Sequence, residues 1–238
     1  MWNPNNTSDL LPQRPMALGA QVAQSMRVLI ISGQLPPGAH LVEDALAVQF
    51  DVSRGPVRDA LRELQHEGLI EPKRRGYYVL GLAAQDIDEL YSLRGALEAF
   101  AVSLAMTTAR PEDWEPAHLA VQEMKLAAEA DDAMRFSEMD MTFHSFIYQL
   151  SRHSRLAAVW RVYGRTFAAI LQVTNGPGGD LRESAEDHAA LLKILREGDE
   201  AKAVNAVKAH LYRASRRLQA VRWTETTVKP PDGATTAT

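Results

Sequence analysis

Residues 33–79 read GQLPPGAHLVEDALAVQFDVSRGPVRDALRELQHEGLIEPKRRGYYV, and this stretch decides the fold of the first part of the chain. Its apolar period and turn residues predict short helices followed by two strands around a basic tip. Together with an amphipathic helix before it, the pattern predicts a winged helix-turn-helix. The helices are expected at 18–32, 43–50 and 54–67, and the strands at 69–72 and 77–80.

The third of these helices carries a stripe of arginines. Arg54, Arg58 and Arg62 stand at i, i+4 and i+8, on the side opposite the apolar residues of the helix. Ser53, just before them, is a predicted N-cap. In the major groove of DNA, such a helix contacts guanine edges and phosphates with its N-terminal side chains. A solvated face paired with neighbouring acidic residues is the alternative interpretation of the same stripe.

The tip of the predicted hairpin is a second basic feature. Lys73, Arg74 and Arg75 precede Gly76, where a glycine allows the backbone to approach DNA and an arginine can enter a narrow minor groove. The whole chain has a net charge of −4, whereas residues 1–84 hold 8 Lys/Arg and 8 Asp/Glu. A neutral head with a basic face, joined to an acidic body, is typical of a modular DNA-binding protein.

Every element predicted after residue 84 is a helix. Six amphipathic segments, separated by breaks rich in Pro, Gly and Asp, predict an antiparallel all-α bundle. The expected fold class is therefore mainly α, with an N-terminal winged helix-turn-helix and a C-terminal bundle of six helices. These helices are expected at 86–108, 112–129, 132–150, 154–174, 181–197 and 200–222. The domains are expected at 14–82 and 83–223, between disordered tails at 1–13 and 224–238.

Four polar side chains in the helical half occupy core-facing positions where apolar residues are expected. Asp140 and His144 are one helical turn apart, so both can reach one ion. His188 and His210 lie at similar distances on either side of the turn at 198–199, which places them level on adjacent helices, on the order of 15 Å from the turn. A carboxylate and three imidazoles need a partner in an apolar interior, and one divalent metal ion satisfies all four.

The composition limits the chemistry of this site. The chain has no cysteine, so the ligands must be nitrogen and oxygen atoms. Zinc is the expected ion, and nickel and manganese remain open, because the order of affinities alone does not choose between them. For each single histidine the alternative is a hydrogen-bonded core imidazole, and for Asp140 it is an ion pair.

The composition also bears on location. No apolar run approaches the length of a membrane span, and the N-terminus lacks the basic and apolar regions of a secretory signal. The lack of cysteine is consistent with a reducing compartment. We therefore expect a cytoplasmic protein that has no membrane partner.

Arg94 adds a charged group to the apolar stripe of the helix expected at 86–108. It either pairs with Glu98, one turn along the same helix, or forms a fork for the carboxylate of an effector whose other oxygens reach the metal. Arg165, on the helix expected at 154–174, is a weaker candidate for the same pocket. We therefore assign Arg94, Glu98 and Arg165 to a candidate effector site.

Residues 33–79 closely resemble the winged-helix head of the GntR family of transcriptional regulators. The matching pieces are L-P-P-G, V-S-R-x-P-V-R-[ED]-A-L-R-x-L, E-G-L-[IV] and R-G-x-x-V. The resemblance implies operator contacts by Arg54 and Arg58, and by Arg75 at the wing. The chain departs from the family at Asp44, where some members have a DNA-contacting Arg, and at Gly55, where Thr or Ser is common. The operator sequence therefore cannot be copied from relatives.

The second half resembles the all-helical effector domain of the FadR/VanR branch of that family, called the FCD domain. In metal-containing members an Asp and three His at matching positions bind the ion, which implies this role for Asp140, His144, His188 and His210. The Arg that matches Arg94 commonly faces the ligand. Six helices without an extra linker helix look more like the VanR subgroup. The matching pieces are L-R-x-x-L-E-x-x-A (93–101), D-x-x-F-H (140–144), Asp187-His188 and A-H-L (209–211).

These observations lead to one main hypothesis and two alternatives. The main hypothesis is a repressor that binds a pseudo-palindromic double-stranded DNA operator as a homodimer and responds to a small carboxylate held between Arg94 and the metal. One alternative is a metal-dependent enzyme with an appended DNA-binding head, with Glu98 or Glu138 as its base. The other is a regulator in which the metal is purely structural or is itself the signal.

Overall fold

A computed structural model describes residues 17–175 and 180–225 of the chain. The disordered tail predicted at 1–13 lies outside the described residues, and so does the tail predicted at 224–238 from residue 226 onward. The chain divides after Gly81 into two compact units, one residue before the boundary expected from the sequence.

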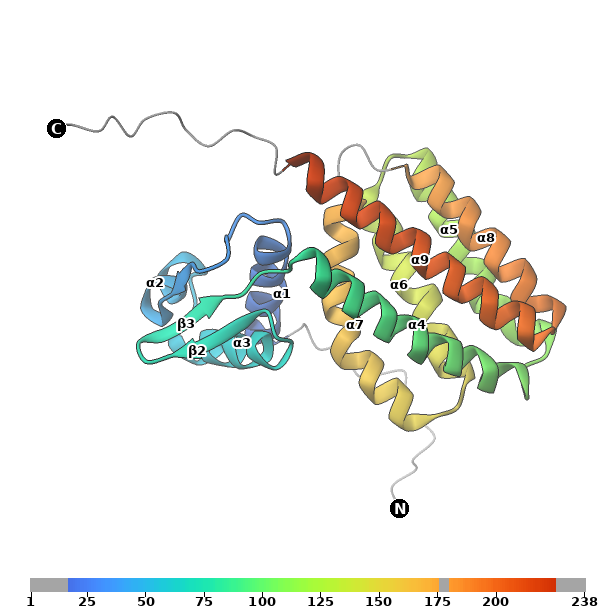
Figure 1. Cartoon of the computed structure of the whole chain (residues 1–238), viewed down its shortest axis with the longest axis horizontal. Helices are drawn as coiled ribbons and strands as arrows, with labels where there is room; N and C mark the ends of the chain where they lie inside the picture. Colours follow the sequence, from blue (N-terminus) through green and yellow to red (C-terminus); the bar gives the residue numbers. More distant parts are fainter. Residues whose placement is uncertain (1–16, 176–179, 226–238) are drawn as a thin grey trace, which may run out of the picture. The chain divides into compact units, whose positions relative to one another are not determined.

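The first unit is a winged helix-turn-helix, as predicted from the sequence (Figure 1). The three strands form one antiparallel sheet in the order β1-β3-β2, in which Ile70 pairs with Val79 and His40 with Tyr78. The two-residue strand β1 was not predicted, and it adds a third strand to the wing. The elements are α1 (Leu18–Ile31), β1 (His40–Leu41), α2 (Glu43–Gln49), α3 (Arg54–His66), β2 (Ile70–Lys73) and β3 (Gly76–Val79).

Helix α3 is fixed against α1 by an apolar face and by one buried cation. Its buried residues, Val57, Ala60, Leu61 and Leu64, are fully enclosed. Arg27 of α1 is only 1% exposed, and its guanidinium binds Glu67 at 2.6 Å and Glu63 at 2.7 Å. Because both acids lie in the last turn and at the C-terminal end of α3, this ion pair network sets the position of the arginine-bearing helix.

A histidine of β1 packs against the wing and holds the end of its basic tip. The ring of His40 stacks on Tyr78 with centroids 4.7 Å apart, and its Nε2 donates to the carbonyl oxygen of Arg75 at 2.8 Å. Gly76 follows with a φ of 126°, and a Cβ at this position would lie 2.9 Å from His40 Nε2. Only glycine therefore fits beside His40 at the end of the basic tip.

The second unit is a helical bundle, and the six α-helices predicted for it are confirmed among its described residues (Figure 1). One 3-10 turn separates the first two of them. Helix α6 packs against α4, α5 and α7, while α4 also packs along α9. The elements are α4 (Ala84–Met106), η2 (Pro111–Trp114), α5 (Glu115–Glu129), α6 (Ala133–Leu150), α7 (Ser154–Thr174), α8 (Leu181–Glu197) and α9 (Glu200–Glu225).

Aspartate side chains cap the N-termini of two helices that carry the site, α6 and α8. Asp132 accepts a hydrogen bond from the backbone N–H of Arg135 at 2.9 Å and begins α6, and Asp180 does the same for Glu183 in α8. Gly198 ends α8 with a left-handed φ of 78°. The tight turn that follows returns the chain as α9, which brings the middles of the two helices together. None of the described helices combines the length and apolar character needed to cross a membrane.

Candidate functional site

The aspartate and three histidines predicted to share an ion lie together in the helical unit. Asp140 and His144 come from α6, His188 from α8 and His210 from α9, and each residue is at most 4% exposed. One ring nitrogen of each histidine lies within 4.8 Å of those of the other two. Asp140 approaches two of the rings, with Oδ2 3.3 Å from His188 Nε2 and Oδ1 3.6 Å from His144 Nε2. Four side chains from three helices thus converge on one point.

Hydrogen bonds to acceptors outside this cluster determine the tautomer of two of the imidazoles. His188 Nδ1 donates to the carbonyl oxygen of Ser184 at 2.7 Å, because a carbonyl oxygen can only accept. His144 Nδ1 donates to Oε1 of Glu98, which lies on α4. In its neutral form each ring therefore turns an unprotonated Nε2 toward the cluster, and a neutral ring nitrogen of this kind is what a metal ligand requires.

The electrostatic surroundings favour the same protonation states. Burial raises the pKa of Asp140, but the nearby His188, His144 and Arg94 outweigh burial and hold this pKa well below its usual range. Burial lowers the pKa of His144, and for His210 burial, together with the neighbouring basic side chains, lowers the pKa strongly. Asp140 is therefore ionised and these two imidazoles are neutral near pH 7, as metal ligation demands.

Several buried polar atoms of this region have no hydrogen-bond partner among the described residues. They include Asp140 Oδ1, His188 Nε2 and His210 Nδ1. An unsatisfied buried polar atom costs about 1–3 kcal/mol, so three of them at one place would be a substantial penalty. A divalent cation would satisfy them together. The nitrogen and oxygen donors at this point therefore fit a divalent metal ion.

Two phenylalanines of α6 hold the rings in place. Phe143 lies edge-on to His144 and His188, with ring centroids 5.2 and 5.3 Å away, and Phe136 lies edge-on to His188 at 6.4 Å. Both phenylalanines are fully buried. The imidazoles are thus packed as well as hydrogen bonded, so their nitrogens keep their direction without an ion.

Arg94 pairs with Glu98, which is one of the two interpretations that its position in the sequence allowed. Its Nε lies 3.2 Å from Glu98 Oε2, so the intrahelical ion pair forms. Its Nη2, however, is buried without a partner among the described residues. The guanidinium packs over Phe167 and Trp160, 4.7 and 5.3 Å from the ring centroids. One edge of Arg94 is therefore occupied and the other is available to an anion.

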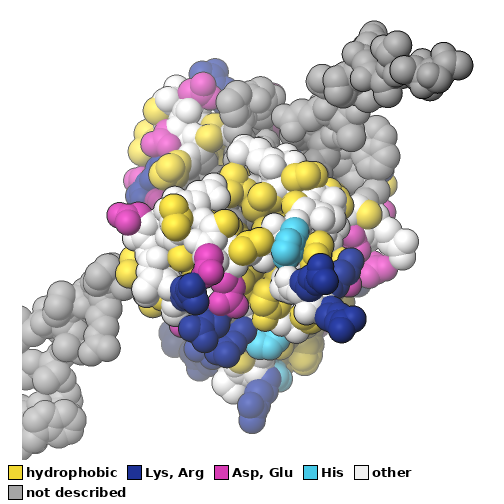
Figure 2. Space-filling view, turned by 90° about the vertical axis from the view of Figure 1, so that its left-hand side faces the viewer, with side chains coloured by type: hydrophobic (Ala, Val, Ile, Leu, Met, Phe, Trp, Pro, Cys, Tyr) yellow, Lys and Arg dark blue, Asp and Glu magenta, His cyan; other side chains and the backbone are white. Residues whose placement is uncertain are grey.

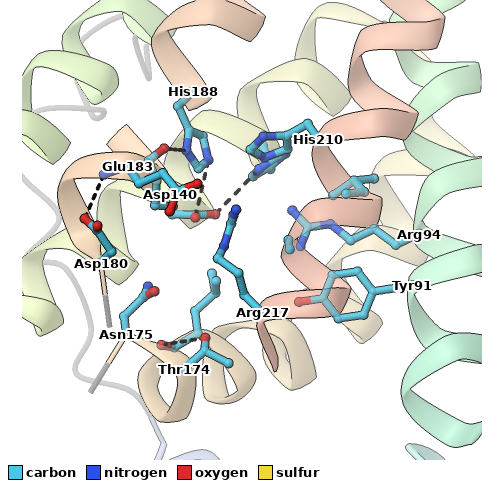
Figure 3. Close-up of a pocket in the computed structure, with 15 residues that line it drawn as sticks. Tyr91, Arg94, Asp140, Thr174, Asn175, Asp180, Glu183, His188, His210 and Arg217 are labelled. Carbon is cyan, nitrogen blue, oxygen red and sulfur yellow. Dashed lines mark hydrogen bonds and ion pairs between the residues drawn. The ribbon is translucent and has the colours of Figure 1, made fainter. Parts of the chain in front are cut away.

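A pocket of about 260 Å³ opens beside these groups (Figure 3). Asp140, the three histidines and Arg94 line it, and Figure 3 shows Arg94 and Tyr91 on one side of it, with Asp180 and Glu183 on the other. Burial raises the pKa of Tyr91 to about 12, so its hydroxyl stays protonated. Glu98 does not line the pocket; it lies behind Arg94 and His144 and is fully buried.

Arg165, predicted for the same pocket, is exposed and is not among the lining residues. It precedes Thr174, which does line the pocket, by nine residues, and nine residues correspond to half a turn around the helix. The arginine found there instead is Arg217 of α9, whose Nη1 bonds Asp187 at 3.1 Å. The sequence held a signal for it, because Arg217 follows His210 by two helical turns and so shares its face.

The arginines of α3 are displayed on the surface of the first unit. Arg54, Arg58 and Arg62 have side chains 65%, 55% and 67% exposed. Figure 2 shows Lys and Arg side chains in groups on one side of the molecule, with acidic side chains beside some of them. Ser53 is the N-cap residue of α3, as predicted, and is exposed with an extended backbone, but its side chain makes no capping hydrogen bond.

Acidic side chains of α2 accompany two of these arginines. Arg54 Nε lies 2.6 Å from Asp44 Oδ1, and Arg58 Nε lies 3.6 Å from Glu43 Oε2. At the wing, Arg74, Arg75 and Gly76 are all exposed at the turn between β2 and β3. The predicted DNA-contacting residues thus lie on the surface.

The geometry does not support either glutamate as the base of an enzyme. Glu98 is fully buried, and its two oxygens are occupied by His144 and Arg94. Glu138 is exposed, pairs with Arg135 at 3.4 Å and does not line the pocket. A general base must reach the proton that it removes, and neither group is placed to do so.

Family models match both halves of the chain. One described as "Bacterial regulatory proteins, gntR family" matches residues 18–79, and one described as "FCD domain" matches residues 89–213. The solved structure of McbR/YncC from Escherichia coli superimposes with a TM-score of 0.67 at 23% identity, covering 90% of this chain and all of that one. At that identity the likeness shows the fold.

Relatives of the chain are described as transcriptional regulators. The gluconate operon transcriptional repressor of Bacillus subtilis is 35% identical over 60% of this chain and 58% of its own length. A Paenarthrobacter nicotinovorans protein described as "Probable D-xylose utilization operon transcriptional repressor" is 31% identical over 82% of this chain and 85% of its own. The match to the Bacillus protein thus spans less than two thirds of it. These relatives are regulators rather than enzymes.

Proposed function

Because the chain belongs to the GntR family of bacterial regulatory proteins and carries an FCD domain, we propose that it is a cytoplasmic transcriptional repressor whose DNA binding responds to a small carboxylate. The observation that carries the proposal is the group of unpartnered buried atoms beside the pocket. A cation would satisfy the unpartnered oxygen of Asp140 and the unpartnered nitrogens of His188 and His210, and an anion would satisfy Nη2 of Arg94.

The winged helix-turn-helix is the DNA-binding half of the proposal. Arg54 and Arg58 would contact base edges and phosphates in the major groove, while Arg75 at the wing would reach the minor groove. Two copies of the chain would form a homodimer on a pseudo-palindromic double-stranded operator, since symmetric half-sites require a symmetric protein. Two observations support this role: Arg54 and Arg58 are exposed, and a hydrogen bond from His40 holds the backbone of Arg75 at the wing.

The helical unit is the effector-binding half. Asp140, His144, His188 and His210 would hold a divalent ion, with zinc expected and nickel or manganese as alternatives. When bound, the ion supplies positive charge that attracts a ligand oxygen. Arg94 then offers its free edge to the same carboxylate, and Glu98 keeps Arg94 and His144 oriented. Among the described residues no extra helix links the two units, which supports the VanR-like subgroup.

The DNA-binding half can be tested on a duplex that the protein itself selects. The purified protein is used to select this duplex from random-sequence DNA, and binding to it is measured by fluorescence anisotropy. Arg58→Ala should weaken binding about 10-fold, the loss expected for one base contact. The matched control is Arg161→Ala, which removes an exposed arginine of α7. Equal affinity of the Arg58→Ala variant and the parent for the selected duplex would contradict the proposed DNA-binding surface.

A further inference from the structure

The pocket has two chemically different ends. The inner end is lined by buried side chains, namely Arg94, Asp140 and the three histidines. At the outer end the lining comes from the last residues of α7 and the first turn of α8. We call this outer set the rim, and Figure 3 shows it across the pocket from Arg94. The rim consists of Thr174, Asn175, Asp180 and Glu183.

The rim is made of hydrogen-bond acceptors. The hydroxyl of Thr174 already donates to the carbonyl of Ile170 at 3.0 Å, and the amide of Asn175 donates to Ser137 at 3.1 Å. Both side chains therefore keep oxygen lone pairs for a ligand. Asp180 and Glu183 add two carboxylates. Groups of this kind accept hydrogen bonds from ligand hydroxyls, which an alkyl chain does not have.

The charges of the two ends have opposite signs. With a divalent ion bound, the ion and Arg94 face the carboxylates of Glu98 and Asp140, so the inner end keeps one net positive charge. Arg217, which also lines the pocket, pairs with Asp187, and Arg213 shares that carboxylate. The rim carries the negative charges of Asp180 and Glu183. One ligand carboxylate is thus attracted inward, while a second carboxylate at the far end would be repelled.

We infer that the ligand of this pocket is a small hydroxylated monocarboxylic acid, with its carboxylate at Arg94 and its hydroxyls donating to the rim. The inference rests on the proposed effector pocket and goes beyond it by excluding two classes of acid. Fatty acids would make no hydrogen bonds to the rim, and dicarboxylic acids would place a negative charge against Glu183. A volume of about 260 Å³ also limits the ligand to a few carbon atoms.

Isothermal titration of the full-length, zinc-loaded protein with matched acids tests this inference. The six-carbon set is gluconate, hexanoate, glucarate and glucitol, and the three-carbon set is glycerate, propionate and malonate. In at least one set the hydroxylated monocarboxylate should bind about 10-fold more tightly than the plain and dicarboxylic acids, which is the gain expected from hydrogen bonds to charged acceptors. Glucitol should not bind, and chelated protein should bind none of the acids.

The Glu183→Ala variant tests whether the rim distinguishes hydroxylated monocarboxylic acids from dicarboxylic acids. The variant should lose about 10-fold in affinity for the hydroxylated acid and should bind the dicarboxylic acid more tightly than the parent does. The matched control is Glu186→Ala, on the same helix and exposed but not lining this pocket. Elemental analysis should give the same zinc content for both variants and the parent, because neither residue touches the metal cluster.

The outcomes separate this inference from the proposed function. If a plain or dicarboxylic acid binds best in both sets, the inference is overturned while a carboxylate pocket remains. If Glu183→Ala leaves the preference unchanged, the role of the rim is overturned. If no acid of either set binds the zinc-loaded protein, both the inference and the proposed effector pocket fail.

Discussion

The Nδ1 atoms of His144 and His188 show how single hydrogen bonds prepare the cluster. Each donates to an acceptor outside the cluster, Glu98 in one case and the backbone of Ser184 in the other. The sequence predicted that both rings face the core, because helical spacing fixes the face of a side chain. It could not predict the tautomer of His144, because Glu98 lies 46 residues earlier on another helix. Orientation of this kind depends on packing.

Glu98→Gln should weaken metal binding. An amide in place of the carboxylate removes a charged acceptor from His144, and loss of such a partner typically costs 10- to 100-fold in metal affinity. Competition against a chromophoric chelator measures the change. Glu138→Gln, an exposed change on α6, is the matched control and should bind metal as the parent does. An unchanged dissociation constant for Glu98→Gln would show that His144 is not a ligand or does not depend on Glu98.

Asp44 stands where some members of the family have an arginine, and in this structure it forms an ion pair with Arg54. The two side chains lie 2.6 Å apart, so under the proposed function Asp44 would compete with DNA for Arg54. Asp44→Asn should raise affinity for a random-sequence duplex by up to about fivefold, the limit set by an exposed ion pair. Anisotropy titrations at one fixed salt concentration measure the change. Glu112→Gln, with the same charge change in the other unit, should leave affinity unaltered; an equal gain there would make the effect non-specific.

At the scale of elements, local signals explain which helices were predictable. Helix α8 has the bounds expected from the sequence, because Asp180 caps its start and Gly198 ends it. Strand β1 was missed, because a two-residue strand has no period of its own and exists only by pairing with β3. Arg165 was misplaced for a related reason. Charge alone suggested the pocket, but the face of α7 that lines it is the opposite one.

The contact between α1 and α3 depends on Arg27, which no pattern in the sequence singled out. Arg27→Ala leaves the buried Glu67 without its cation and should destabilise the first unit by about 3 kcal/mol. Hydrogen exchange of peptides from α1 and α3, read by mass spectrometry in the full chain, gives the free energy of opening for this unit. Arg62→Ala, an exposed arginine of α3, is the control and should change it by less than about 0.5 kcal/mol. Equal protection in the two variants would contradict a structural role for Arg27.

At the scale of the whole molecule, the chain joins a winged helix-turn-helix unit to a helical unit whose pocket we propose to hold a metal ion and an anion. The aspartate and histidines come from α6, α8 and α9, Arg94 from α4 and Thr174 from α7, so a ligand in this pocket would contact five helices. A ligand that binds one arrangement of these helices better than another shifts their equilibrium by its difference in affinity. The sequence predicted both units and the cluster between the helices, but not the acidic rim, which forms only when two helix ends come together.

The affinity of the metal-loaded protein for its selected duplex, measured by anisotropy with and without the acid that binds best, tests most directly whether the pocket controls DNA binding. We expect the acid to change this dissociation constant by about 5- to 150-fold, the usual range of coupling between two sites. In protein stripped of metal, the acid should change nothing. The same dissociation constant with and without a saturating acid, in protein shown to hold both metal and acid, would contradict the claim that this pocket controls DNA binding.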